Sequence, residues 1–328
     1  MATAEPASSL SVEDVHAARD AIGGRLHRTP TMSSASLGEK LGTRAVLKAE
    51  LFQRTGSFKP RGVLAKLASL TADEKAGGVI GISAGNHAQA LAYGSALEGV
   101  SCLVVMWTGA SEQKIEATRA YGAEVDLVAS SPAEAFERLA ELSETSQRAL
   151  VHPFDDPVVL AGQGTVGLEI VEDVPGVDVV VCPVGGGGLL AGIATALQDV
   201  LRPIRVVAVE PELSTALHAA LEAGEPVAVQ PTSIADGLSA PFAGRYPLAV
   251  AQRLVPETAL VTEAEIVAAM RFLYERAKLA CEPAGAVATA ALLAGKVALE
   301  SGSTVAVVVS GGNVSPGTAS AILDADEG

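Results

Sequence analysis

The sequence predicts an α/β fold built on parallel β-sheets. Short, valine-rich apolar runs alternate along its 328 residues with longer segments of helical periodicity, which is the pattern of repeated βαβ units. Several runs, such as VDVVVCPV at 177–184, are apolar almost throughout, which indicates strands that helices cover on both faces. A chain of this length is sufficient for two domains.

The expected elements follow from this alternation. Strands are predicted where β-branched apolar residues cluster, at residues 45–48, 78–82, 101–106, 124–127, 177–182, 205–210 and 304–309. Helices are predicted where apolar residues recur with helical spacing, at residues 12–21, 61–70, 88–97, 111–121, 132–146, 189–200, 213–223, 263–278 and 285–294. Polar, glycine and proline residues gather near 70–78 and 148–157, which predicts a small domain at 75–150 inserted into a large domain formed by 1–74 and 151–328.

Composition and charge favour a globular protein that binds a small molecule. Hydrophobic residues make up 49% of the chain and aromatic residues 3%, so Ala, Val, Leu and Ile must form most of the core. A formal net charge of −15 opposes binding to nucleic acid and to anionic membranes. The N-terminal sequence lacks a signal-peptide pattern and no uninterrupted apolar run reaches the ~20 residues of a membrane span, so we expect a cytoplasmic protein.

Metal, disulfide and catalytic-triad sites are not indicated. Cys102, Cys182 and Cys281 lie far apart in apolar or small-residue settings, which predicts buried free thiols. His87 is the only histidine inside a motif, and the others have no spacing typical of metal ligands.

The motif SFKPRG, residues 57–62, places one lysine between an aromatic residue and a proline where a predicted strand gives way to a helix. Pro60 suits the first helical position. Because a residue before proline is biased toward extended geometry, we expect Lys59 to be extended and to project from a fixed junction. An apolar neighbour such as Phe58 would lower the pKa of the Lys59 amine, as a lysine that acts as a base or forms a Schiff base requires.

Three further motifs follow predicted strands, and the loops at the carboxyl ends of parallel strands are where such folds bind ligands. SAGNHAQ, residues 83–89, offers small residues and the free N–H groups of a helix start, which attract an anion; alternatively, Ser83 is a helix N-cap and Asn86 a turn residue. PVGGGGLL, residues 183–190, permits a nest of backbone amides around a phosphate, or is a tight turn. SGGN, residues 310–313, could place the Ser310 hydroxyl against a ring nitrogen, or be a simple turn.

Together, these four motifs in this order resemble the serine/threonine dehydratase family of fold-type II pyridoxal-phosphate enzymes. The resemblance covers nearly the whole chain and includes the segments 117–125 (ATRAYGAEV), 152–170 (HPFDDPVVLAGQGTVGLEI), 234–238 (IADGL) and 282–286 (EPAGA). It implies a tryptophan synthase β-like fold, in which two open parallel-sheet α/β domains hold pyridoxal 5'-phosphate in the cleft between them.

The resemblance also implies roles for single residues. Lys59 would form the Schiff base with the cofactor, Phe58 would pack beside it, Asn86 would bind the ring oxygen and Ser310 would face the ring nitrogen. The cofactor phosphate would be held by Gly185, Gly186, Gly187, Gly188 and Leu189, and the site would be bordered by Gly237 and Glu282. The loop expected to receive the substrate carboxylate is formed by Ser83, Ala84, Gly85, Asn86 and His87.

The implied activity is the removal of water from L-threonine or L-serine, which gives 2-oxobutanoate or pyruvate plus ammonia, with Lys59 as the base that takes the Cα proton. Alternatives are a dehydratase for another β-hydroxy amino acid such as threo-3-hydroxyaspartate, a serine or aspartate racemase, and a nucleotide-binding module without catalytic activity. Ala84 argues against a racemase, since similar serine racemases carry an acid/base serine at this position. The resemblance further suggests a homodimer or homotetramer.

Other departures from the family pattern narrow the expectation. Ala216 stands where some members have an aspartate that helps to bind a divalent cation near Glu210, so we expect no metal site and a solvated or salt-bridged Glu210. Trp107 either packs on the surface or reshapes the cleft. The chain stops soon after Ser310, so we expect no regulatory extension and no inhibition by isoleucine.

Overall fold

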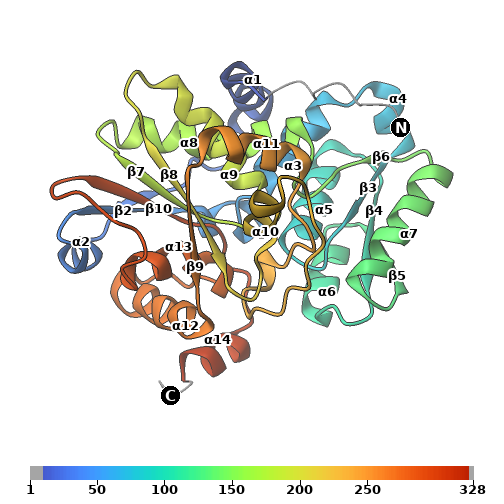
Figure 1. Cartoon of the computed structure of the whole chain (residues 1–328). Coiled ribbons are helices and arrows are strands. Elements are labelled where there is room, and N and C mark those ends of the chain that lie inside the picture. The colour runs from blue at the N-terminus through green and yellow to red at the C-terminus, as the bar shows by residue number, and fades with distance from the viewer. Residues whose placement is uncertain (1–9, 325–328) are drawn as a thin grey trace.

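The computed structural model describes residues 10–324, and within them the strands form two separate sheets (Figure 1). The larger sheet has six strands in the order β1-β2-β10-β7-β8-β9. Its strands are β1 (Thr31–Ser33), β2 (Arg44–Ala49), β7 (Val179–Pro183), β8 (Arg205–Pro211), β9 (Glu257–Val261) and β10 (Thr304–Val309). The neighbours pair in parallel except for β1, which lies antiparallel at the edge beside β2.

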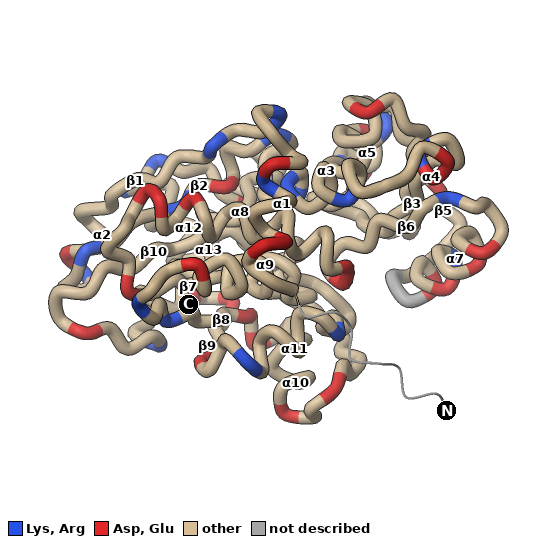
Figure 2. The backbone as a smooth tube through the Cα atoms, turned by 90° about the horizontal axis from the view of Figure 1, so that it is seen from above, with Lys and Arg blue, Asp and Glu red and all other residues tan. Residues whose placement is uncertain are grey.

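The smaller sheet is parallel throughout and has the strand order β5-β4-β3-β6. Its strands are β3 (Val79–Ile82), β4 (Cys102–Trp107), β5 (Glu124–Ala129) and β6 (Ala149–Leu150). Figures 1 and 2 place these strands on one side of the molecule and β7 to β10 on the other. The small domain predicted at residues 75–150 stays a prediction, and it is supported by the grouping of β3 to β6 in a sheet of their own.

Helices cover both faces of the larger sheet. Alternate residues of each central strand belong to two different apolar cores: Val180, Ala208 and Ala306 face one, whereas Val181, Val207 and Val307 face the other. This is the period of two that a strand imposes. The first core contains residues of α1 (Val12–Ile22), α3 (Pro60–Ser69), α8 (Pro157–Asp173), α9 (Gly188–Ala196), α10 (Ala216–Ala223) and α11 (Arg245–Leu254). The second contains residues of α2 (Ala35–Leu41), α12 (Glu263–Phe272), α13 (Pro283–Leu293) and α14 (Pro316–Leu323).

The smaller sheet lies between α5 (Asn86–Glu98) and α7 (Pro132–Thr145), whereas α6 (Glu112–Ala120) packs against α5 and α4 (Ala72–Gly77) precedes β3. Helix α5 also packs against α3, so one apolar core continues from the larger sheet into the smaller one.

Glycines let the central helices approach closely. A Cβ at Gly162 of α8 would lie 2.5 Å from the carbonyl oxygen of Arg61 in α3, and one at Gly192 of α9 would lie 2.3 Å from the carbonyl oxygen of Leu160. Such approach is closer than any side chain permits, so α8 joins α3 and α9 into one compact layer beneath the site described below.

All predicted strands and helices are present, with shifts of one to three residues at most ends. Helix α12 ends at Phe272 and continues as a π-turn at Leu273–Ala277, so the predicted helix at 263–278 is regular only in its first part. The sequence reasoning missed β1, β6, β9, α2, α4, α8, α11 and α14. The predicted parallel-sheet α/β architecture is confirmed, and the antiparallel β1 adds an edge strand to the larger sheet.

Two predictions from composition can be compared with the structure. Cys102, Cys182 and Cys281 are buried free thiols, as predicted. Over residues 10–324, none of the helices combines the length and the apolar character that crossing a membrane requires. Figure 2 shows basic residues interspersed with more numerous acidic ones.

Candidate active site

A cavity at the carboxyl ends of the strands brings together residues from the whole length of the chain. The cavity is partly open to solvent. Its lining includes every residue that the resemblance assigned to the cofactor: Phe58, Lys59, Asn86, Gly185, Gly186, Gly187, Gly188, Leu189, Gly237, Glu282 and Ser310. Strands β3, β7 and β10 each end at or shortly before the residues that they contribute to the cavity, as expected for a ligand site in an open α/β sheet.

Lys59 lies directly before α3, but its backbone is helical (φ −55°, ψ −36°) and not extended as predicted. Two hydrogen bonds override the preference imposed by Pro60: the Phe58 amide donates to the distant carbonyl of Ser310 at 3.2 Å, and Arg61 N closes a local turn over Lys59 by donating to Phe58 O at 3.1 Å. Pro60 occupies the start of the helix, as predicted. The junction is therefore fixed from β10 as well as from α3.

The Lys59 amine is shielded from water, and an appreciable minor fraction of it is neutral at physiological pH. Its Nζ donates to the carbonyl oxygen of Pro153 at 2.9 Å and lies 5.1 Å from the centre of the Phe58 ring. Burial lowers the pKa of Lys59 to about 8, because desolvation penalises the charged ammonium. A lysine in this state can act as a nucleophile and as a base.

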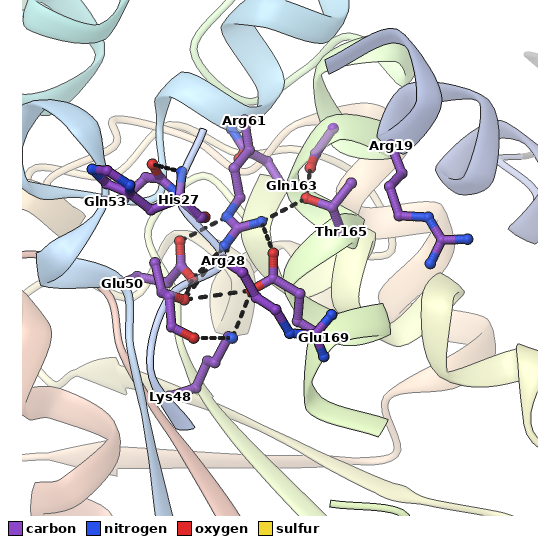
Figure 3. Close-up of polar contacts among 12 residues, drawn as sticks. Arg19, His27, Arg28, Lys48, Glu50, Gln53, Arg61, Gln163, Thr165 and Glu169 are labelled. Carbon is purple, nitrogen blue, oxygen red and sulfur yellow. Dashed lines mark hydrogen bonds and ion pairs between the residues drawn. The ribbon is translucent and has the colours of Figure 1, made fainter. Parts of the chain in front are cut away.

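A buried ion network anchors the first turn of α3, two residues beyond Lys59 (Figure 3). Arg61 donates to both carboxylate oxygens of Glu50 at 2.8 Å and to those of Glu169 at 2.7 and 2.9 Å. Lys48 donates to Glu169 at 2.6 Å and to the carbonyl of Thr29 at 2.8 Å. Two cations and two carboxylates thus neutralise each other, and they join β2, α3 and α8 at the point where Lys59 is placed.

The glycine run between β7 and α9 leaves its backbone exposed to the cavity. A Cβ at Gly186 would lie 2.3 Å from Cγ of Phe154, and one at Gly185 would lie 2.9 Å from the backbone of Leu238. Gly187 adopts φ +90°, a conformation that favours glycine. The first amides of α9 have no partner within the helix, so this segment presents donors and the positive end of the helix dipole to an anion.

The loop between β3 and α5 is ordered around its own polar groups. The Ser83 hydroxyl accepts a hydrogen bond from the amide of Gly85 at 3.0 Å, whereas the N-cap position itself is Gly85 and has no side-chain cap. The alternative that Ser83 is the N-cap of this helix is therefore wrong. Ser83, Ala84, Gly85 and His87 do not line the cavity, so of this loop only Asn86 does, and the role of the others in binding substrate stays a prediction.

Two histidines next to the cavity are neutral at physiological pH. Burial, and secondarily the charge of Lys59, lowers the pKa of His87 to about 3, and its Nε2 bonds the carbonyl of Val151 at 2.9 Å. Burial lowers the pKa of His152 to about 4, and its Nδ1 accepts from the amide of Asp155 at 2.8 Å. Neither imidazole is placed or charged to act as a general acid.

Ser310 and Glu282 also line the cavity. The buried Ser310 hydroxyl donates to the carbonyl of Ala284 at 3.4 Å. Glu282 is buried and accepts from Asn86 Nδ2 at 2.6 Å; burial, and secondarily the charge of Asp236, raises the pKa of its carboxyl to about 7. The cavity wall is thus built from neutral hydroxyl and amide groups beside one weakly acidic carboxyl.

Sequence reasoning missed part of the site. The cavity is also lined by Phe154, Pro183, Val184, Leu190, Leu238 and Ala284. Phe154 lies in the segment 152–170 that supported the resemblance, and its ring packs edge-on against those of His152 and Phe242, with centroids 4.7 and 5.6 Å apart. A phenylalanine beside two acidic residues in a loop carries no local signal for this position.

Glu210 corrects a prediction. It is buried at the end of β8, and its two oxygens accept from the amides of Leu217 and His218 at 2.8 Å, so it caps α10 and is neither solvated nor salt-bridged. Within residues 10–324, no group of three or more His, Cys, Asp or Glu side chains is arranged to hold a metal ion. Trp107, at the end of β4, packs against the small core formed with α7 and lies outside the cavity lining.

A family model described as "Pyridoxal-phosphate dependent enzyme" matches residues 23–311. The chain belongs to this family. Its L-threonine ammonia-lyase relative from Geobacter sulfurreducens is 42% identical over 94% of this chain and 77% of the relative. The L-threonine dehydratase catabolic TdcB of Escherichia coli K12 is 40% identical over 93% of both chains.

Solved structures give the same fold. Maize serine racemase matches with a TM-score of 0.90 and 34% identity over 94% of this chain and 95% of that chain. The threonine deaminase of T.th. matches with a TM-score of 0.87 and 40% identity over 93% of this chain and 99% of that chain. The fold is therefore fold-type II with two α/β domains, and the enzyme uses pyridoxal phosphate.

The side chains of this chain fit that cofactor. A buried amine of lowered pKa stands at one end of the cavity, and an unbranched backbone segment with free amides stands at another. These are the partners that an aldehyde and a phosphate need.

Proposed function

We propose that this enzyme is a threonine/serine ammonia-lyase, which removes water and then ammonia from L-threonine or L-serine. The names of the similar enzymes in Geobacter sulfurreducens and Escherichia coli, at 42% and 40% identity, support this substrate class. The single structural observation that carries it is Lys59, a buried amine whose pKa is lowered to about 8 and which shares one cavity with the glycine run.

The chemistry divides between cofactor and chain. Bound pyridoxal phosphate supplies a conjugated ring that delocalises the negative charge left when the substrate Cα proton is removed. The amides of Gly185 to Leu189 would hold its phosphate, the Asn86 amide would donate to the ring oxygen, and the Ser310 hydroxyl would face the ring nitrogen without adding a charge that holds a proton there.

Lys59 Nζ takes the Cα proton. The carbonyl of Pro153, 2.9 Å away, orients the amine, and the neighbouring Phe58 ring keeps water from one side of it. Since the neutral fraction of the amine increases as the pH approaches 8, proton abstraction becomes more efficient over the same range. The loop at residues 83–87 receives the substrate carboxylate through the amides at the start of α5.

The test is an assay of 2-oxo acid and ammonia with L-threonine, L-serine and L-threo-3-hydroxyaspartate. L-threonine and L-serine should give both products, and the hydroxyaspartate tests the alternative substrate class. Lys59→Ala should abolish both activity and the visible absorption band of the bound cofactor. Lys66→Ala is the matched control, because Lys66 lies in the same helix and forms a partly exposed ion pair with Asp156 at 2.6 Å. Retained activity in Lys59→Ala would overturn the assignment.

A racemase is the second candidate, since the maize serine racemase structure matches closely. Ala84, whose methyl group cannot exchange a proton, favours the lyase.

We further propose that the protein is a cytoplasmic homodimer or homotetramer. It should bind neither nucleic acid nor membrane, because its net charge of −15 opposes both. Size-exclusion chromatography with light scattering tests the oligomeric state.

A further inference from the structure

A chain of side-chain hydrogen bonds reaches the cavity from outside and begins at a backbone carbonyl. Asn313, in the loop after β10, donates through Nδ2 to the carbonyl oxygen of Thr55 at 2.7 Å and to Oδ1 of Asn86 at 2.7 Å. Asn86, the first residue of α5, donates through Nδ2 to Oε1 of Glu282 at 2.6 Å. Asn86 and Glu282 line the cavity, whereas Asn313 does not.

The chemistry of the first acceptor fixes the direction of the whole chain. A backbone carbonyl can only accept, so the end of Asn313 that faces Thr55 must be the NH₂ group. The same NH₂ group faces Asn86, so the atom of Asn86 that meets it must be the oxygen. The nitrogen of Asn86 is then directed to the other side, toward Glu282.

The loop that supplies the carbonyl is held in an unfavourable conformation around Asn313. Thr55 has φ +60° and ψ +13°, which is the left-handed region that β-branched residues rarely adopt. Gly56 follows with φ +75°, and a Cβ there would lie 2.3 Å from Oδ1 of Asn313. The amide of Gly312 donates to the carbonyl of Gly56 at 2.9 Å. Strain of this kind persists where the surrounding structure requires it, and here it provides both the acceptor and the space for Asn313.

We propose that Asn313 is a positioning residue that keeps the carboxamide of Asn86 turned with its nitrogen toward the cofactor ring. The proposal rests on the assigned role of Asn86 as donor to the ring oxygen. Without Asn313, only the Glu282 contact orients the Asn86 carboxamide, and a carboxamide turned end for end would direct its oxygen toward Glu282 and toward an acceptor on the cofactor. Two facing acceptors repel each other and leave a hydrogen bond unmade.

The positioning role of Asn313 is tested by titrating pyridoxal phosphate into the cofactor-free protein at pH 8. Visible absorption and circular dichroism of the bound cofactor give the dissociation constant. Asn313→Asp keeps the shape but cannot donate, so Asn86 should turn over and the dissociation constant should rise about 10- to 100-fold. Asn313→Ala removes the donor without adding an acceptor, so Glu282 still favours the native orientation of Asn86, and the dissociation constant should rise by about tenfold or less. If Asn313 only fills space, the order of the two variants is reversed, and that result would overturn the proposal.

A double-mutant cycle with Asn86→Ala separates the possible failures. If Asn313 acts through Asn86, then Asn313→Ala should change cofactor affinity by less than twofold once Asn86 is alanine. Fully additive effects of the two alanine substitutions on cofactor affinity would overturn the proposal. Because neither alanine introduces a buried charge, the cycle tests the proposal even if Asn313→Asp does not fold. Asn86→Ala with unchanged affinity would instead refute the role assigned to Asn86. If Asn86→Ala weakens cofactor binding but Asn313→Asp leaves it unchanged, the role of Asn86 stands and only the positioning role of Asn313 is refuted.

Discussion

Arg61→Lys is the substitution that most directly tests how the site is held. Arg61 is buried and uses its N–H groups on four partners: both oxygens of Glu50, both oxygens of Glu169, and the hydroxyls of Thr165 at 3.0 Å and Thr29 at 3.4 Å. Although burial acts to lower it, the pKa of Arg61 is raised by these carboxylates. The side chain therefore stays charged, and a planar fork of five donors matches two carboxylates at once.

Lysine keeps the charge but has three donors on one atom. At least two charge-assisted hydrogen bonds are lost, and each contributes about 1.5–3 kcal/mol, so the free energy of unfolding should fall by about 3–6 kcal/mol. Breaking a buried ion pair costs a similar amount, about 3–5 kcal/mol. Because Lys59 lies two residues before Arg61, the loosened helix start should also weaken binding of pyridoxal phosphate.

Urea unfolding at pH 7 measures the effect on stability. Although burial acts to raise it, the pKa of Glu169 is held below its ordinary value by Arg61 and Lys48. The ionised Glu169 therefore contributes its full share to the free energy of unfolding above its unfolded pKa of about 4.3, and this share is lost as the pH falls through the lower folded pKa. At pH 7 the substitution should thus show its full effect on stability. Arg138→Lys is the matched control, because Arg138 also pairs with two carboxylates, Asp126 and Glu141, but is more exposed than Arg61. A loss in Arg61→Lys no larger than in Arg138→Lys would refute the reasoning.

Three further predictions concern the cavity. The rate at which pyridoxal phosphate joins the cofactor-free protein should rise roughly tenfold per pH unit up to pH ~8 and then level off, because only the neutral Lys59 amine attacks the aldehyde. Stopped-flow absorbance measures this rate, and a continued rise through pH 10 would contradict the lowered pKa of Lys59. L-serine should give pyruvate without appreciable D-serine, and Ala84→Ser should increase D-serine in a chiral chromatographic assay. Gly186→Ala should weaken cofactor binding at least tenfold, since its Cβ would meet Phe154 at 2.3 Å, whereas Gly176→Ala, with no atom within 4 Å, should not.

The sequence predicted what depends on chain order. Parallel strands end at one edge of their sheet, so the motifs that follow β2, β7 and β10 of the larger sheet were expected to meet. Asn86 follows β3 of the smaller sheet, and it lines the same cavity as Lys59, Gly185 and Ser310. Local rules failed where distant contacts decide. The conformation of Lys59 follows from the bond between Phe58 and Ser310, not from Pro60. Helix α8 was missed because its glycines weaken the helical signal, yet they are what lets α3 and α9 approach it.

The same limit applies to polar side chains. Glu210 was expected to be solvated or salt-bridged because Ala216 removes a possible metal ligand, but the start of α10 folds over it and offers two amides. Asn313 belongs to a motif that by itself reads as a turn. Its contact with Asn86 joins residues 227 positions apart, and no local pattern encodes such a contact.

The electrostatics of the cavity explain how one lysine can serve both cofactor and substrate. Among the described residues that line the cavity, Lys59 is the only lysine or arginine, and the nearby His87 and His152 are neutral because their pKa values lie at about 3 and 4. A phosphate bound by a second cation would gain affinity, but that cation would also stabilise a neighbouring carboxylate or depress further the proton affinity of Lys59. Holding the phosphate on amides and a helix dipole, as proposed above, would avoid this coupling, because partial charges bind an anion without a titrating group. The pKa of Lys59 is then set by burial, and it stays near the value at which the amine can both accept and release a proton.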